Sequence, residues 1–556
     1  MTDSKDSNSS VLTRRGLLKA SGAALGGLAV GASLNSFAAK KSNPADPCDS
    51  CGTCLSGECT YPPAYPDTQK YTYYETQLRT WKPKQRQQEI PGLPPEAVPE
   101  TYVLPAKNEM RITFLGSCIP NQLRRAQQMM SIFVEVGPTD ETEPDQFVFD
   151  CGSGVCTNYN TMGISLGRMD KIFLTHLHGD HISDLIHIYC FGAVADRKSP
   201  LFIWGSGPSG VKSPMPPRKL YDDGVRAFCA NLRETCRWHS ESQSFISTSY
   251  ASYEFPTRQS WGLPIDPKQV SDDPIGDGYA IVPIELDWQK YGKVKGDNIA
   301  YDNPKTGVKI THFPVIHCRR GSVGYKLEWN GLSMIYTGDT KPEYLSVDKA
   351  KGVNVFIHEM NPPAQVWAFK NMGLYQPPEP DWPSYNSFQS SVDFAKMVQN
   401  SSHTPQGAFG YLLSQINPRP QLTVATHFPV ADDMVECAMS SIEAHNEGIQ
   451  WGTDFICSFD LMVLKVTQNG TAEPTIEKFR AEVSDYEFAA LGKAYTDLNP
   501  PKYWRYAVDA NGNIQYDANG NPIKIGDPFA QIDQSTAIPS CDNGDGVKCN
   551  YREDGY

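Results

Sequence analysis

Residues 174–183 read LTHLHGDHIS and place three histidines and one aspartate within six positions, directly after a run of apolar residues. The apolar run predicts a short buried strand. His176 and His178 stand two residues apart, so both can point to the same side of a sheet edge and bind one metal ion. The glycine that follows permits a tight turn, after which Asp180 and His181 can reach a second ion from the start of a helix. The stretch therefore predicts a metal site at the end of a strand.

Further ligands are expected downstream, because two neighbouring divalent cations repel each other and need a carboxylate between them. Asp339, in IYTGDT, follows an apolar run and can supply that carboxylate. His317, at the end of KITHFPVIH, can complete the ligands of the first ion, and His427, in TVATHF, those of the second. Imidazoles and carboxylates suit zinc, with iron or manganese as alternatives. We therefore predict two divalent metal ions, with zinc favoured, bound by His176, His178, Asp180, His181, His317, Asp339 and His427.

These motifs resemble the metallo-β-lactamase superfamily, through THLHGDH, the FLGS strand before it, the FDCGSG turn and the later His, Asp and His. In detail the chain is similar to the ribonuclease Z and arylsulfatase-like branch, through SVGYKLEWNGLSMIYTGDT, IHEM and THF. The resemblance covers roughly residues 108–470. It implies an α/β fold, a four-layer αββα sandwich with a dinuclear site at one edge. It also favours His317 over His312 as a ligand, because His317 stands closer to the Val323-Gly324-Tyr325 marker.

The resemblance implies roles for three more side chains and a second role for Asp180. In the ribonuclease Z branch a histidine before the last ligand acts on the leaving group, and His403 in SHT occupies that place. His403 is therefore the candidate general acid, with a surface histidine at a helix start as the alternative. His358 and Glu359 end a buried strand and are expected to orient neighbouring groups. Asp180 is a candidate for orienting the attacking water as well as for binding metal.

The first 39 residues are expected to be a twin-arginine signal peptide and no part of the fold. The twin-arginine pattern is TRRGLLK at residues 13–19, and a weakly apolar stretch and the small-residue site SFAA at 36–39 follow. The apolar stretch at 20–34 is too short and too rich in glycine and alanine for a stable membrane span. We therefore expect export through the twin-arginine machinery to the periplasm or beyond. An amphipathic helix that begins with two arginines is the alternative.

Three segments are expected after the signal. Residues 40–107 form an N-terminal arm that is first Cys-rich and then rich in proline and tyrosine. Residues 108–485 form the hydrolase domain, with aromatic insertions at 221–262 and 363–387, and residues 486–556 form a C-terminal extension. In an oxidising compartment the clustered cysteines of the arm favour disulfides, with zinc or an iron–sulfur cluster as the alternative. These cysteines are Cys48, Cys51, Cys54 and Cys59.

Together these features predict an exported dinuclear metal-dependent hydrolase that attacks a small ester with metal-activated hydroxide. A phosphodiester or sulfate ester is favoured over a carboxylic ester or lactone. No nucleic acid partner is expected, because the net charge of -13 would repel RNA. The alternatives are a ribonuclease Z-like phosphodiesterase or endonuclease, and a redox protein with a di-iron or iron–sulfur centre. A non-catalytic binding module is disfavoured by the complete ligand set, and the sequence leaves the oligomeric state open.

Overall fold

The computed structural model describes residues 104–120, 127–195, 197, 200–243, 279–293, 296, 298–362, 378–428, 452–480, 515–520 and 523, with single positions between 364 and 372 and between 442 and 450. The expected signal peptide, the four clustered cysteines and nearly all of the N-terminal arm lie outside these residues. So do residues 244–262 of the first insertion, much of the second insertion and most of the expected C-terminal extension. Those expectations therefore stay predictions.

The chain divides into two units. The larger unit comprises residues 78–363, 396–490 and 494–556, and it contains both sheets and every residue of the candidate site. The described residues of the smaller unit lie within Ala364–Ala395, which includes the first part of α12 (Tyr385–Ser402). In the described part of the chain, no helix is both long enough and apolar enough to cross a membrane.

The first sheet has eight strands and changes from antiparallel to parallel pairing at β3. Its antiparallel part joins residues from both ends of the domain, since β1 pairs with β2 on one side and with β14 on the other. Its parallel part runs from β3 to β6. In sheet order the strands are β15 (Thr475–Arg480), β14 (Met462–Thr467), β1 (Glu109–Gly116), β2 (Ser131–Val136), β3 (Asp145–Phe149), β4 (Lys171–Phe173), β5 (Leu201–Ser206) and β6 (Ile281–Leu286).

The second sheet has seven strands and the same mixed character. Strands β13 to β10 pair in parallel, whereas β10 to β7 pair antiparallel. The β9–β10 hairpin turns at Asn330 and Gly331, which both have positive φ, at 47° and 75°. In sheet order the strands are β13 (Phe455–Cys457), β12 (Leu422–Thr426), β11 (Val355–Glu359), β10 (Leu332–Tyr336), β9 (Val323–Trp329), β8 (Val308–Pro314) and β7 (Ile299–Asn303).

The two sheets pack face to face through aromatic side chains. Successive side chains of β4 point to opposite faces of the first sheet, so only alternate residues lie between the sheets. Ile172 joins the core under the helices, whereas its neighbour Phe173 faces the second sheet. The Phe173 ring stacks on Trp204 at 4.4 Å between centroids and meets the edge of Tyr325 at 5.5 Å. Trp204 also donates its Nε1–H to the carbonyl of Ala300 on β7, at 2.8 Å. This contact fixes the spacing of the two sheets next to the 174–181 loop.

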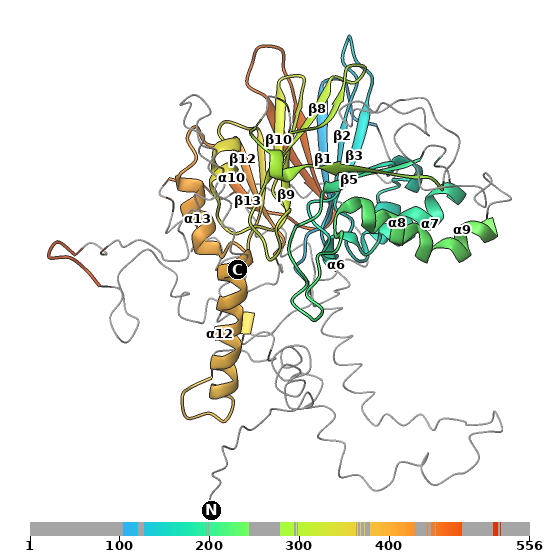
Figure 1. Cartoon of the computed structure of the whole chain (residues 1–556). Helices are drawn as coiled ribbons and strands as arrows, with labels where there is room; N and C mark the ends of the chain where they lie inside the picture. Colours follow the sequence, from blue (N-terminus) through green and yellow to red (C-terminus); the bar gives the residue numbers. More distant parts are fainter. Residues whose placement is uncertain are drawn as a thin grey trace, which may run out of the picture. The chain divides into compact units, whose positions relative to one another are not determined.

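Helices cover the outer face of each sheet (Figure 1). On the first sheet, Tyr159, Tyr189 and Leu232 from three different helices share one core with Ile172. On the second sheet, Phe409 packs against Phe455 of β13 at 5.7 Å between ring centroids. The helices are α5 (Val155–Thr161), α6 (Gly179–Ile182), α7 (Leu185–Ala195), α8 (Val225–Thr235), α9 (Arg237–Gln243), α10 (Tyr344–Lys349) and α13 (Gln406–Ser414). The predicted four-layer αββα sandwich is confirmed.

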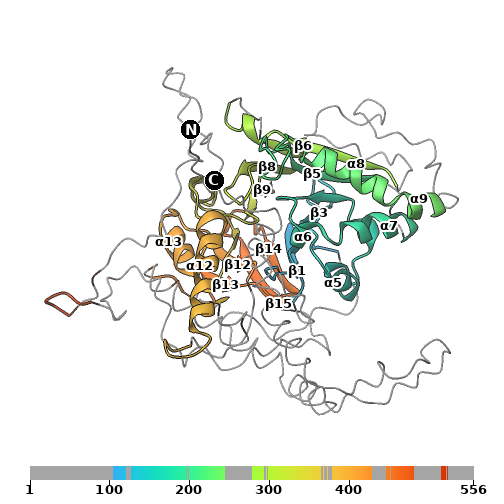
Figure 2. The same ribbon diagram turned by 60° about the horizontal axis from the view of Figure 1, so that its bottom comes forward.

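Several strands end at one edge of the sandwich, where the loops that follow them converge (Figure 2). The loop after β4 carries the LTHLHGDHIS stretch, and α6 begins within it. From the second sheet, the loops after β8, β10 and β12 bring His317, Asp339 and His427 to the same edge. Ligands of α/β sheets commonly bind beyond the carboxyl ends of strands, so this edge is the place for a site.

Candidate metal centre

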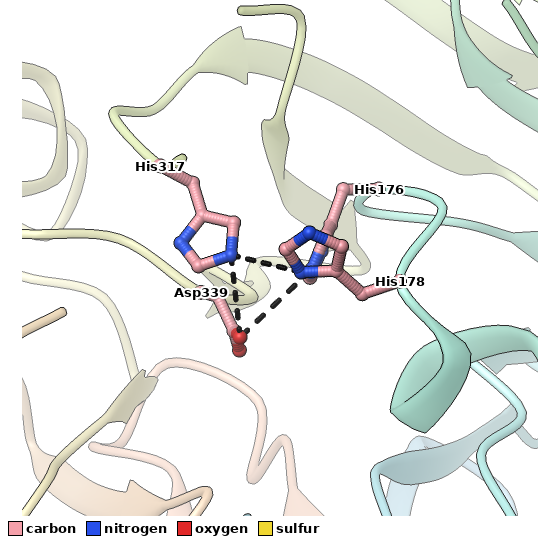
Figure 3. A group of neighbouring side chains, drawn as sticks. All are labelled: His176, His178, His317 and Asp339. Atoms are coloured by element: carbon pink, nitrogen blue, oxygen red, sulfur yellow. Dashed lines mark hydrogen bonds and ion pairs between the residues drawn. The ribbon is translucent and has the colours of Figure 1, made fainter. Parts of the chain in front are cut away.

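Four predicted ligands form the first cluster (Figure 3): His176, His178, His317 and Asp339. Nδ1 of His178 lies 2.9 Å from Nε2 of His176 and 3.1 Å from Nε2 of His317. Oδ2 of Asp339 lies 3.8 Å from Nε2 of each of those two histidines. Three ring nitrogens and one carboxylate oxygen thus point toward a common centre, which is the arrangement that a tetrahedral metal ion requires.

The second cluster consists of Asp180, His181, His427 and the same Asp339. Nε2 of His181 lies 3.3 Å from Oδ2 of Asp180 and 3.2 Å from Oδ1 of Asp339. Nε2 of His427 lies 3.1 Å from Oδ2 of Asp180 and 3.5 Å from Oδ2 of Asp339. Because Asp339 belongs to both clusters, it lies where the sequence requires a shared carboxylate.

The arrangement of the side chains in the second cluster suits bound cations better than a closed network of hydrogen bonds. Nε2 of His181 and Oδ1 of Asp339 are buried, yet neither has a hydrogen-bond partner among the described residues. Buried polar atoms are normally hydrogen-bonded, so both atoms are oriented for a ligand. The carboxylates of Asp339, Asp180 and Asp150 raise the pKa of His181 against the effect of its burial. This excess of negative charge around the second cluster is what a divalent cation balances.

The protonation states of the first cluster also suit metal binding. Burial and the neighbouring His181 hold the pKa of His176 well below its usual range, and burial lowers that of His317 to about 3. Burial alone would raise the pKa of Asp339, but His427 and His181 lower it well below its usual range. Neutral imidazoles and an ionised carboxylate are the forms that bind metal. The two clusters therefore indicate binding of divalent metal.

Asp150 organises the second cluster, a role not expected from the sequence. Its carboxylate accepts hydrogen bonds from the backbone and hydroxyl of Thr175, both at 2.8 Å, and from the hydroxyl of Tyr336 at 2.8 Å. It also lies 2.7 Å from Nδ1 of His181, which leaves Nε2 to face the centre. Asp150 follows β3 directly, in FDCGSG, and has a φ of 56°. An aspartate directly after a strand is therefore the sequence signal that could have indicated this role.

His403 lies beside both clusters and pairs with Glu359. Nδ1 of His403 is 3.0 Å from Oε1 and 2.9 Å from Oε2 of Glu359. The His403 ring lies 4.9 Å from that of His317 and 5.7 Å from that of His427. Burial disfavours a charge on His403, but the Glu359 carboxylate outweighs it and raises the pKa of His403 to about 9. This raised pKa favours the protonated form of His403, which is the form in which a general acid acts.

His358 does not share the position of Glu359. The two are consecutive on β11, so they point to opposite faces of the second sheet. The His358 ring packs against Phe409 of α13 at 5.2 Å, and its Nδ1 lies 2.7 Å from the carbonyl of Glu359. Glu359 thus contacts His403, whereas His358 packs under α13. The rival ligand His312 lies on β8 opposite Tyr325 and is in none of the clusters that the described residues form.

A cavity of about 370 Å³ lies next to the first cluster. His176, His178 and His317 form part of its lining, together with residues from the loops after β5 and β8. Its volume is at the lower end of the range for pockets that bind small molecules.

The chain has sequence relatives among ribonucleases. No protein-family model matches it. It is 26% identical over 260 residues to "Ribonuclease BN" of Proteus mirabilis, which covers 45% of this chain and 76% of that protein. It is 32% identical over 105 residues to "Ribonuclease BN" of Enterobacter sp., which covers 18% of this chain and 32% of that protein, about a third of its length.

Solved structures also align with part of the chain. The metallo-β-lactamase fold protein YhfI of Bacillus subtilis is 12% identical with a TM-score of 0.37, covering 64% of this chain and 99% of that one. The short form of human tRNase Z is 19% identical with a TM-score of 0.33, covering 64% of this chain and 98% of that one. The chain thus combines αββα layers and two clusters of metal-binding side chains with sequence similarity to ribonucleases.

Proposed function

We propose that the protein hydrolyses a small ester, with a phosphodiester favoured over a sulfate ester. The observation that carries the proposal is the pair of four-residue clusters that share Asp339, with His403 next to them. The name of the relatives, Ribonuclease BN, favours a phosphodiester. A metal pair of this kind would activate water for attack and stabilise the charge that develops on the scissile group.

Four side chains have further roles in the proposed reaction. Oδ2 of Asp180 lies about equally far from His181 and His427, so this carboxylate can bind metal and orient the attacking water. His403 donates a proton to the departing oxygen, and Glu359 keeps His403 protonated. Asp150 holds His181 in the required orientation. Zinc is the proposed metal, because imidazoles and carboxylates make up both clusters. Manganese and iron are the alternatives.

A ribonuclease Z-like endonuclease is the second candidate, since it agrees with the names of the relatives. Two observations favour a small substrate instead. The chain carries a net charge of -13, which opposes the binding of a polyanion. The cavity beside the first cluster, of about 370 Å³, has the size of a small molecule.

Export through the twin-arginine pathway is part of the proposal, and the support for it is the TRRGLLK pattern at residues 13–19. Replacing Arg14 and Arg15 with lysine should hold the protein in the cytoplasm, as measured by fractionation and immunoblotting. A double variant that reaches the periplasm as efficiently as the wild type would rule out this route.

The proposed activity is tested with a panel of aryl phosphodiesters, aryl sulfates, lactones and RNA, using protein loaded with zinc, manganese or iron. We expect phosphodiester hydrolysis that is lost in His176→Ala and His178→Ala. His187→Ala is the matched control, because His187 is an exposed histidine on α7. Unchanged hydrolysis in the two site variants would refute the proposal. Cleavage of RNA in preference to every small ester would favour the endonuclease, and visible absorbance that bleaches on reduction would favour a redox protein.

A further inference from the structure

The cavity beside the first cluster has a lining of mixed chemistry. The histidines of the cluster line it, together with the apolar side chains of Leu177 and Phe228. Two arginines, Arg319 and Arg320, line it from the loop that follows β8. A substrate whose ester lies at the histidines therefore extends toward both an apolar surface and a positively charged loop.

The two arginines differ in what they already bind. Nε of Arg319 donates to Oδ2 of Asp223 at 2.6 Å, and its Nη2 donates to the carbonyl of Val211 at 3.1 Å. Nη2 of Arg320 is buried and has no hydrogen-bond partner among the residues that the structure describes. Arg319 thus already forms hydrogen bonds within the protein. Nη2 of Arg320 is a buried donor that forms none with the described residues.

The carboxylates of the lining do not neutralise Arg320. Asp223 is engaged by Arg319 and by the hydroxyl and backbone N–H of Ser209, at 2.7 and 2.8 Å. Oδ1 of Asp222 accepts from the backbone N–H of Gly224 at 3.2 Å. Within the described ranges, neither aspartate forms an ion pair with Arg320. A guanidinium that is partly removed from water without an acceptor favours any anion that reaches it.

The backbone around Arg320 is anchored on both sides. On one side, Arg319 is held by Asp223. On the other side, the carbonyl of Gly321 accepts a hydrogen bond from the hydroxyl of Ser206, at the end of β5. Gly321 has a φ of 100°, which only glycine adopts without strain, and a Cβ there would approach Nε1 of Trp288 to 3.0 Å. The loop therefore presents Arg320 from a fixed backbone.

We propose that Arg320 binds an anionic group on the part of the substrate that is not cleaved, and so determines specificity. The substrate is then a small ester with a second anionic group, such as a carboxylate, and an apolar portion that contacts Phe228 and Leu177. This inference rests on the proposed hydrolysis of a small ester at the adjacent cluster. A planar guanidinium suits a carboxylate or phosphate because it can donate two parallel hydrogen bonds.

A pair of matched substrates tests the inference. Both are 4-nitrophenyl phosphodiesters, and the second aryl group carries a 4-carboxylate in one and a neutral 4-carboxamide in the other. We expect the wild type to prefer the carboxylate in kcat/KM by on the order of tenfold to a hundredfold. Arg320→Gln should abolish the preference and Arg320→Lys should retain part of it, since lysine keeps the charge without the planar fork. Arg237→Gln, which removes an exposed charge on α9, should leave the preference as in the wild type.

Calorimetry with the two corresponding non-hydrolysable phosphonates separates this inference from the proposed reaction. The carboxylate should bind more tightly than the carboxamide to the wild type, by a similar factor, and equally well to Arg320→Gln. Absence of hydrolysis with this binding pattern intact would refute the proposed reaction alone. A wild type that binds both phosphonates equally, or an Arg320→Gln variant that keeps the preference, would overturn the role of Arg320.

Discussion

Replacing Glu359 with glutamine should move the alkaline limit of activity to lower pH. The carboxylate of Glu359 lies 2.9 Å from Nδ1 of His403 and raises the pKa of His403 to about 9. His403 is therefore protonated below that pKa and loses its proton as the pH rises through it. Without the Glu359 carboxylate, the burial of His403 is offset only by Asp339 and Asp180, so the pKa of His403 falls toward its ordinary value of 6.5.

The size of the effect follows from the protonated fraction. At pH 8, a histidine with a pKa of about 9 is about 90% protonated, and one with a pKa of 6.5 is about 3% protonated. If His403 is the general acid, Glu359→Gln should therefore lose about thirtyfold in rate at pH 8 and little at pH 6. Bound cations would lower the pKa of His403 in both proteins, so the separation between the two alkaline limits is the quantity that reports on Glu359.

The assay is a pH profile of kcat for phenyl and 2,4-dinitrophenyl phosphodiesters, with metal content measured at each pH. Dinitrophenolate leaves without a proton, so only the phenyl ester should show the separation between wild type and Glu359→Gln. His403→Ala is the control, since it should reduce hydrolysis of the phenyl ester far more than that of the dinitrophenyl ester. Identical alkaline limits for wild type and Glu359→Gln, at equal metal content, would refute the assignment of His403.

Three further changes test how the site is supported. Asp150→Asn removes the charged acceptor of His181 and should weaken binding of the second metal ion about 10- to 100-fold, as measured by chelator competition; unchanged affinity would contradict the role of Asp150. Gly338→Ala should lower the free energy of unfolding in urea by about 2 kcal/mol or more. Residue 338 has a φ of 61°, and the new Cβ would approach Cβ of Thr175 to 2.5 Å. A variant as stable as the wild type would contradict this. His358→Leu should lower stability by about 1–2 kcal/mol while metal content stays the same, and loss of metal would place His358 in the site after all.

The 174–181 loop and the strand ends could be predicted because their signals are local. The apolar run and the spacing of His176 and His178 fix a strand end and a shared side within a few residues. The hairpin at Asn330-Gly331 is equally local, since both residues adopt positive φ as the turn demands. Expecting Asp339 to be shared required only the repulsion between two cations.

The organising contacts could not be predicted because they join distant parts of the chain. The partners of Asp150 lie 25, 31 and 186 residues away, at Thr175, His181 and Tyr336. The free donor of Arg320 likewise emerges only when Asp223 is seen to be engaged by Arg319. The separation of His358 from Glu359 follows from the sequence alone, because consecutive residues of a strand point to opposite faces of the sheet.

The central claim is that seven side chains bind two metal ions that share Asp339. Elemental analysis of protein dialysed against zinc-containing buffer and then desalted tests it most directly. We expect about two ions per chain in the wild type, about one in His178→Ala and in His427→Ala, and none firmly bound in Asp339→Ala. A wild type without stoichiometric metal, or an Asp339→Ala variant that retains two ions, would contradict the claim.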